Sequence, residues 1–141
     1  MIITRLEYVD KTNKNTFILN FNDILTLLVG VSGVGKTRVL NCINTMKKIA
    51  MGDLAETANI DWSLDFVVDG SGCKWSGQIE NGRIVKESMA KGEEMIFSRD
   101  EKEILLEGVS VPKVSDRLSL LAVFWGVGDI KRVYEEIMHI Y

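Results

Sequence analysis

The spacing of apolar residues along the chain predicts strands first and then a helix. Residues 2–8, 17–21 and 24–29 are three short β-prone runs, and the last of them is almost entirely apolar. Such a run is typical of a central strand covered on both faces. Apolar residues then recur every three or four positions over 38–51, which predicts a helix that ends at Gly52. The expected buried stripe of this helix is Val39, Ile43, Met46 and Ala50.

The period falls to two in the middle of the chain. Residues 62–69 and 73–79 alternate between apolar and polar side chains, which predicts two half-buried strands joined by a turn at 69–72. Asn81-Gly82 follows, and this pair is a strong hairpin signal because a type I′ turn needs positive φ at both positions. These runs predict an antiparallel meander, with further strands over 84–89, 95–97 and 104–106.

Two helices are predicted at the end of the chain. Ser115 and Asp116 are the expected N-cap of a helix over 118–125, which glycines at 126 and 128 end. Asp129 is the expected N-cap of a last helix. The apolar stripe of that last helix is Ile130, Val133, Ile137 and Ile140 or Tyr141.

Length and composition favour one globular domain over 1–141. The chain has 141 residues, 46% of them hydrophobic and 26% charged, which excludes disorder. Its net charge of −3 argues against a dedicated nucleic-acid binder. The charge is uneven, however: residues 1–52 carry seven basic and three acidic groups, and the remainder carries ten and seventeen. An anion is therefore expected to bind near the N-terminus.

Other residue types exclude several classes of site and compartment. His139 is the only histidine, so a zinc site built on several histidines is excluded. Cys42 and Cys73 form no C-x-x-C pair and are interpreted as reduced, partly buried thiols of a cytosolic protein. The start of the chain is too charged for a signal peptide, and the longest apolar run, 120–125, is too short to span a membrane. A soluble cytoplasmic protein without a membrane partner is predicted.

One motif carries recognisable chemistry. Residues 30–37, GVSGVGKT, match G-x-x-x-x-G-K-[ST] at every required position, between the strand expected at 24–29 and the helix expected from 38. Gly33 and Gly35 allow positive φ, so that the N–H groups of the loop converge on phosphate oxygens. The first turn of the helix adds further N–H groups and the positive end of its dipole. A nucleotide phosphate site is therefore predicted.

Each residue of this loop has an expected role. Lys36 is the candidate catalytic residue because it would reach the β- and γ-phosphates, and the Thr37 hydroxyl would ligate Mg²⁺. The expected nucleotide-binding residues are Gly30, Val31, Ser32, Gly33, Val34, Gly35, Lys36, Thr37 and Arg38. No convincing acidic partner for the metal follows from the sequence. Asp69 ends an apolar run, but the Gly-Ser-Gly after it favours the end of a hairpin.

The order of elements around the motif resembles a known class of ATPases. Two strands precede the motif and an antiparallel meander follows its helix, as in the N-terminal lobe of ABC and SMC ATPase heads. The opening MIITRLEYVD…FILNFNDILTLLVGVSGVGKTRVLNCI resembles the AAA-type ATPases of bacterial anti-phage systems, including overcome-lysogenization-defect proteins and the ATPases of Septu and of retrons. GQIENGRIVKESM, EEMIFSRD and KVSDRLSLLAVF are similar to the meander and following helix of that group.

This resemblance implies a fold and a function. The fold would be α/β: a P-loop NTPase lobe with a mixed sheet, a P-loop helix, an antiparallel β-meander and C-terminal helices. The cofactors would be ATP and Mg²⁺. The signature motif, the acidic strand with a catalytic Glu and the switch His of the class normally lie beyond the meander, so the chain would be an incomplete head. Gln78, the only glutamine, lies inside a predicted strand and is not assigned as the γ-phosphate sensor.

The resemblance also implies partners. Heads of this class hydrolyse ATP only when two of them enclose the nucleotide, so this chain is expected to bind ATP and turn it over slowly. Expected partners are a second copy or the remaining ATPase lobe, and a nuclease effector of a defence complex. Lys11, Lys14, Lys47 and Lys48 are interpreted as solvated, with DNA contact as a minor alternative.

Two other functions stay open. A small phosphotransferase such as a nucleotide kinase would use the same loop, although no arginine-rich lid is evident. An assembly module that keeps the loop without nucleotide is the second alternative. Among the aromatic residues, Trp62, Phe66, Trp75 and Phe97 are expected in the core rather than in a base-stacking platform. Core packing is also the favoured interpretation of Tyr8, Phe17 and Phe21, with stacking of one of them on adenine as the alternative.

Overall fold

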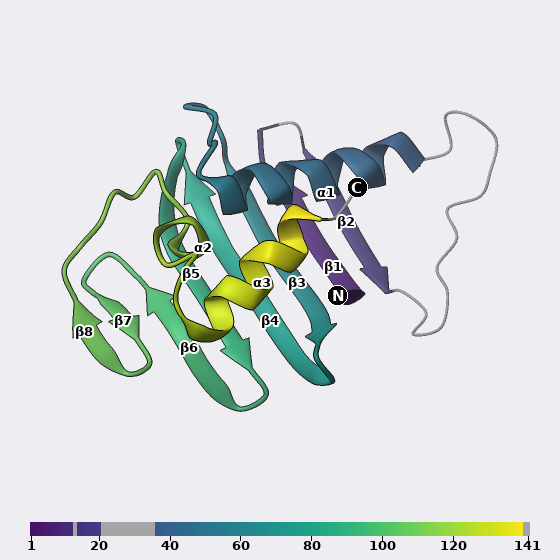
Figure 1. The fold of residues 1–141 in the computed structure, drawn as a ribbon. Helices are drawn as coiled ribbons and strands as arrows, with labels where there is room; N and C mark the ends of the chain where they lie inside the picture. The colour runs from purple at the N-terminus through teal and green to yellow at the C-terminus, as the bar shows by residue number, and fades with distance from the viewer. Residues whose placement is uncertain (13, 21–35, 140–141) are drawn as a thin grey trace.

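The chain folds as one antiparallel sheet with helices on a single face (Figure 1). The computed structural model describes residues 1–12, 14–20 and 36–139. Its eight described strands lie in the order β2-β1-β3-β4-β5-β6-β7-β8. The elements are β1 (Ile2–Asp10), β2 (Asn15–Asn20), α1 (Lys36–Met51), β3 (Ile60–Val68), β4 (Ser71–Glu80), β5 (Arg83–Lys91), β6 (Glu94–Arg99), β7 (Ile104–Leu106), β8 (Val109–Val111), α2 (Leu120–Val123) and α3 (Gly128–Met138).

The expected α/β fold with a mixed sheet is wrong. Every pairing between described strands is antiparallel, and three helices accompany eight strands. Parallel neighbours need a long crossover, usually a helix, whereas β3 to β8 follow one another through short turns. The strand expected at 24–29 lies outside the described residues. The order of connections therefore determines the fold class, and the phosphate-loop motif does not.

The predicted hairpins are confirmed and are fixed by turn chemistry. Asn81 and Gly82 join β4 to β5 with φ of 50° and 72°, as a type I′ turn requires. Asp69 and Gly70 have φ of 50° and 76°, so the turn at 69–72 tightens to two residues. Glu107-Gly108 makes a third turn of this kind before β8, a strand that the sequence did not predict.

The predicted first helix is confirmed, with a corrected buried face. α1 ends where expected, because Gly52 adopts a φ of 81° and the N–H of Asp53 reaches the carbonyl of Lys48 at 2.9 Å. Its buried residues are Cys42, Met46, Ile49 and Ala50, whereas Ile43 is only half-buried. The buried stripe is therefore rotated from the predicted one, because Cys42 and Ile49 face the sheet and Ile43 does not lie at its centre.

The last two helices begin at other positions than expected. α2 spans only four residues, and its N-cap is Ser119, whose side chain accepts a hydrogen bond from the N–H of Leu121, so Ser115 and Asp116 do not cap it. α3 begins at Gly128 after Val127, so Asp129 lies in its first turn. The stripe Ile130, Val133 and Ile137 is buried as predicted, while 140–141 lie outside the description. No described helix is long and apolar enough to cross a membrane.

The two faces of the sheet differ because the strands alternate. In β3 every second residue from Ile60 to Val68 is buried beneath the helices. Trp62 and Trp75 meet edge to face there, with ring centroids 5.3 Å apart. Phe66 and Phe97 are also buried, so the expectation that these four aromatic residues form the core is confirmed.

Gly77 makes room for this aromatic pair. A Cβ at this position would overlap the Trp62 ring and would lie 2.6 Å from the carbonyl oxygen of Lys86. We expect Gly77→Ala to lower the free energy of unfolding by about 1–3 kcal/mol, because neither an indole in a packed core nor a backbone carbonyl can yield freely. Equilibrium urea unfolding measures this loss.

Gly72, on the same strand, provides the matched control. A Cβ there has no neighbour within 4 Å. Gly72→Ala should leave the unfolding midpoint almost unchanged. Equal losses for the two variants would contradict the steric explanation.

Candidate functional site

The first turn of α1 is the described part of the predicted nucleotide site. Gly30, Val31, Ser32, Gly33, Val34 and Gly35 lie outside the described residues. Lys36, Thr37 and Arg38 form the start of the helix, and the first turn contains no acidic residue. Helix N-termini favour negative charge, so two cationic residues here are unfavourable for an isolated helix. A bound anion would remove that penalty.

The rest of α1 holds this turn in a fixed position. Figure 1 shows the helix running across the sheet, with its N-terminal end on the β2 side. The buried residues of its last three turns and the glycine termination described above attach it to the sheet. The described anchoring of the helix is thus at its C-terminal end, away from the motif.

Tyr8 lies beneath this helix. Its ring is buried, and its hydroxyl is hydrogen-bonded to Thr45 of α1. Burial raises the pKa of Tyr8 to about 12, with smaller contributions from Asp10 and Cys42. A ring enclosed in this way cannot stack on adenine, so the expected core position of Tyr8 is confirmed and the alternative is excluded. The Phe17 side chain and Phe21 lie outside the description.

A buried carboxylate at the centre of the sheet has four hydrogen-bond donors. Glu87 Oε1 accepts hydrogen bonds from Trp75 Nε1 at 2.9 Å and from Ser119 Oγ. Its Oε2 accepts from the N–H of Leu120 at 2.9 Å and pairs with Arg99 Nη2 at 3.1 Å. The two charged side chains are 0% and 3% exposed. A fully satisfied carboxylate of this kind serves to join elements rather than to react.

Arg99 extends this network into the loop before α2. Its Nη1 donates to the carbonyl of Ser115 at 3.1 Å, and its Nη2 also donates to the carbonyl of Leu118. One guanidinium therefore fixes the path of the chain over 115–118. This cluster was not predicted from the sequence. The pattern that could have revealed it is the position of Glu87 and Arg99, which fall where apolar, core-facing residues are expected in strands of alternating polarity.

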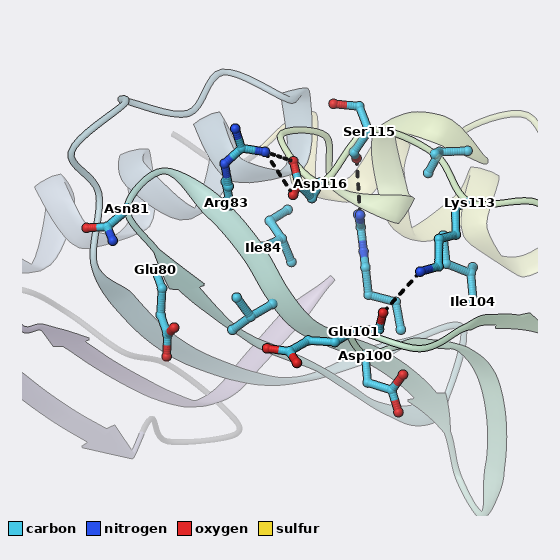
Figure 2. Close-up of a pocket in the computed structure, with 13 residues that line it drawn as sticks. Glu80, Asn81, Arg83, Ile84, Asp100, Glu101, Ile104, Lys113, Ser115 and Asp116 are labelled. Atoms are coloured by element: carbon cyan, nitrogen blue, oxygen red, sulfur yellow. Dashed lines mark hydrogen bonds and ion pairs between the residues drawn. The ribbon is translucent and has the colours of Figure 1, made fainter.

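A cleft of about 680 Å³ lies beside this network (Figure 2). Arg83 reaches across to Asp116, with both carboxylate oxygens 3.1 Å from Nη1. Lys113 Nζ donates to the carbonyl of Glu101 at 3.1 Å. Ile84 and Ile104 contribute apolar surface. The basic groups that line the cleft are thus already paired within the chain.

The described residues that line the cleft include four carboxylates but no nucleophile paired with a base. These residues include no Cys or His, and no Ser among them is paired with a base. Asp100 is held ionised, because N–H groups of Lys102 and Glu103 lower its pKa. Among the described residues, no cluster of three or more His, Cys, Asp or Glu side chains could hold a metal ion.

Other residues singled out in the sequence have structural positions. Asp69 lies in the β3–β4 turn and pairs with Arg132 of α3 at 3.2 Å, which fits the expected hairpin end rather than a magnesium ligand. Gln78 lies within β4, opposite Lys86. The thiols at 42 and 73 are both buried and are not joined in a disulfide, as expected. Lys11 pairs with Asp61 at 3.1 Å, whereas Lys14 and Lys48 are exposed.

No protein-family model matches this chain, and no curated protein matches it. The ATPase class, the defence role and the nuclease effector therefore stay predictions, supported by the sequence resemblance. The motif at 30–37 and the helix that begins at Lys36 are the features that indicate a function.

The Glu87–Arg99 pair can be tested by removing one charge. Glu87→Gln leaves the guanidinium buried without its counter-ion, so we expect a loss of about 3–5 kcal/mol in the free energy of unfolding. Glu80→Gln, at an exposed position of β4, should change it by less than about 0.5 kcal/mol. Urea unfolding measures both. A loss for Glu87→Gln no larger than that of the control would contradict a central role for the pair.

The raised pKa of Tyr8 leads us to expect a loss of folding stability in alkali. The pKa of Tyr8 is about 12 in the folded chain, whereas an unperturbed tyrosine has a pKa of 10.0. Between these values the unfolded chain therefore releases the phenolic proton first. Stability should therefore fall as pH rises above 10, and the fall should end above 12. Tyr8→Phe should reduce this slope in urea unfolding, whereas Tyr134→Phe should keep it. Identical slopes for wild type and Tyr8→Phe would refute the assignment.

Proposed function

We propose that the chain binds Mg-ATP through residues 30–38, with the phosphates at the N-terminus of α1. The observation that carries this proposal is the start of the helix at Lys36, directly after the glycines of the GVSGVGKT motif. Unpaired N–H groups and the positive end of the helix dipole are then available to phosphate. ATP is chosen among nucleotides because the surrounding sequence resembles ATPases.

The charge distribution supports an anionic ligand at this position. The first turn of α1 carries basic and no acidic residues, although acidic residues would stabilise the helix there. The N-terminal 52 residues carry a net positive charge within a negatively charged chain. A triphosphate would neutralise both. Lys36 would pair with its terminal phosphates, and Thr37 would contribute a hydroxyl to Mg²⁺.

The proposal is limited to binding without efficient turnover. Hydrolysis needs a group that positions water and an acidic partner for the metal. The candidate acid Asp69 lies in a turn and is paired with Arg132. In the resembled class, such groups come from the remainder of the head. A small phosphotransferase would instead require rapid phosphoryl transfer by the chain alone.

Calorimetric titration of the purified chain with Mg-ATP tests the proposal. We expect saturable binding, and we expect Lys36→Ala to weaken it by at least about tenfold, because a charge-assisted hydrogen bond to phosphate contributes about 1.5–3 kcal/mol. Lys48→Ala is the matched control, since Lys48 is an exposed lysine of the same helix, about 18 Å further along its axis. It should leave the affinity unchanged.

Phosphate release and circular dichroism complete the experiment. Retained helical signal in Lys36→Ala shows that lost binding is not lost folding. Absent binding by the wild type, or equal binding by both lysine variants, would refute the proposal and favour an assembly module. Turnover of about 1 per second or more would contradict the expected lack of hydrolysis.

A further inference from the structure

The face of the sheet opposite the helices carries a row of serines. Register places Ser63, Ser76, Ser88 and Ser98 side by side across β3, β4, β5 and β6. All four are half-buried, and Ser76 Oγ lies 3.3 Å from Ser88 Oγ. A groove of about 440 Å³ is lined by three of these serines, Ser76, Ser88 and Ser98, and no described helix covers this face. We call this surface the serine face.

Two opposite charges on the serine face, Asp65 and Lys74, lie opposite each other in register, yet neither forms an ion pair among the described residues. Asp65 on β3 and Lys74 on β4 point away from the core, because their neighbours along each strand are buried. One carboxylate oxygen of Asp65 is buried and accepts no hydrogen bond from the described chain. Nearby charges are already paired, Arg5 with Glu7 and Lys11 with Asp61. A second chain could reach only the other carboxylate oxygen, and an unpaired carboxylate favours a cationic partner.

We propose that the serine face binds the serine face of a second copy of this chain. The two-fold axis would run parallel to the strands, between β3 and β4. Such an axis exchanges β3 and β4 between the copies. A residue on β3 therefore faces, in the second copy, the β4 residue that is its register partner within one chain. Asp65 of each copy then faces Lys74 of the second copy, and this ion pair occurs twice.

The remaining central positions are also compatible with this axis. Ser63 faces Ser76 of the second copy, and Asp61 faces Gln78 of the second copy. These pairs can form hydrogen bonds, and none brings like charges together. Small side chains permit close approach of two sheets, which normally pack about 10 Å apart at an angle of about 30°. That angle concentrates contact on the two central strands.

Other axes parallel to the strands give Asp65 a less favourable partner. An axis on β3 sets Asp65 against itself, and an axis on β4 sets Lys74 against itself. An axis between β4 and β5 places Asp65 opposite Met95, because Lys74, Ala90 and Met95 follow Asp65 in one row. An axis between β1 and β3 would set Asp65 opposite Arg5, but Arg5 is already paired with Glu7 within its own chain. Charge complementarity therefore favours the axis between β3 and β4.

Sedimentation velocity of the full chain over a micromolar to submillimolar series tests the dimer. The wild type should dimerise as concentration rises, and added salt should weaken the dimer because its ion pairs lie near solvent. Asp65→Lys and Lys74→Asp should each weaken self-association by about tenfold or more, because each sets two like-charged pairs across the interface. Thermal melts of the dilute variants verify that both fold.

The decisive sample is an equimolar mixture of the two variants. Asp65→Lys in one copy faces Lys74→Asp in the other, and the two unchanged residues pair on the other side of the axis, so the mixture should dimerise at wild-type concentrations. A wild type that stays monomeric throughout, variants that dimerise as the wild type does, or a mixture that stays monomeric would overturn the proposal. None of these readouts depends on nucleotide, so the Mg-ATP proposal stands or falls separately.

Discussion

The buried pair of Glu87 and Arg99 is the constraint on which the arrangement of the helices depends. It joins β5 to β6, and its remaining hydrogen bonds reach Ser119, Leu120 and the carbonyls of the preceding loop. A carboxylate that is 0% exposed must be paired, so the loop has one low-energy path across the sheet. That path sets the direction in which α2 begins, and α3 follows α2 after a short turn.

The same constraint holds the helices over one of the two unlike faces that strand alternation creates. With α3 fixed beside α1, one face is buried beneath apolar helix stripes and contains the aromatic pair of Trp62 and Trp75. The other face keeps serines and charges that antiparallel strands can expose to water. The cleft of Figure 2 lies where the fixed loop crosses the end of the sheet, and Arg99 belongs both to its wall and to the buried pair.

Local chemistry made the hairpins and the end of α1 predictable from the sequence. Asn81-Gly82 and Gly52 act through their own backbone conformations, so neighbouring residues are sufficient to identify them. Glu87 and Arg99 were missed because their burial depends on each other and on Ser119, far along the chain. The fold class failed for a related reason: the phosphate-loop motif describes eight residues, whereas sheet type follows from how every strand is connected. Of the candidate site, the sequence identified the loop, and the described structure adds the start of its helix.

The two ends of α1 differ in sequence because only the C-terminal part packs against the sheet in the described structure. Residues from Cys42 onward bury the helix against the sheet, and Gly52 closes it, so packing stabilises the helix without a favourable N-terminus. The first turn is therefore free to carry Lys36 and Arg38, which oppose the helix dipole. A helix stabilised at its C-terminal end can keep a basic first turn, and the positive end of a helix dipole favours a polyphosphate. The basic charge at this terminus therefore does not serve the stability of the helix itself.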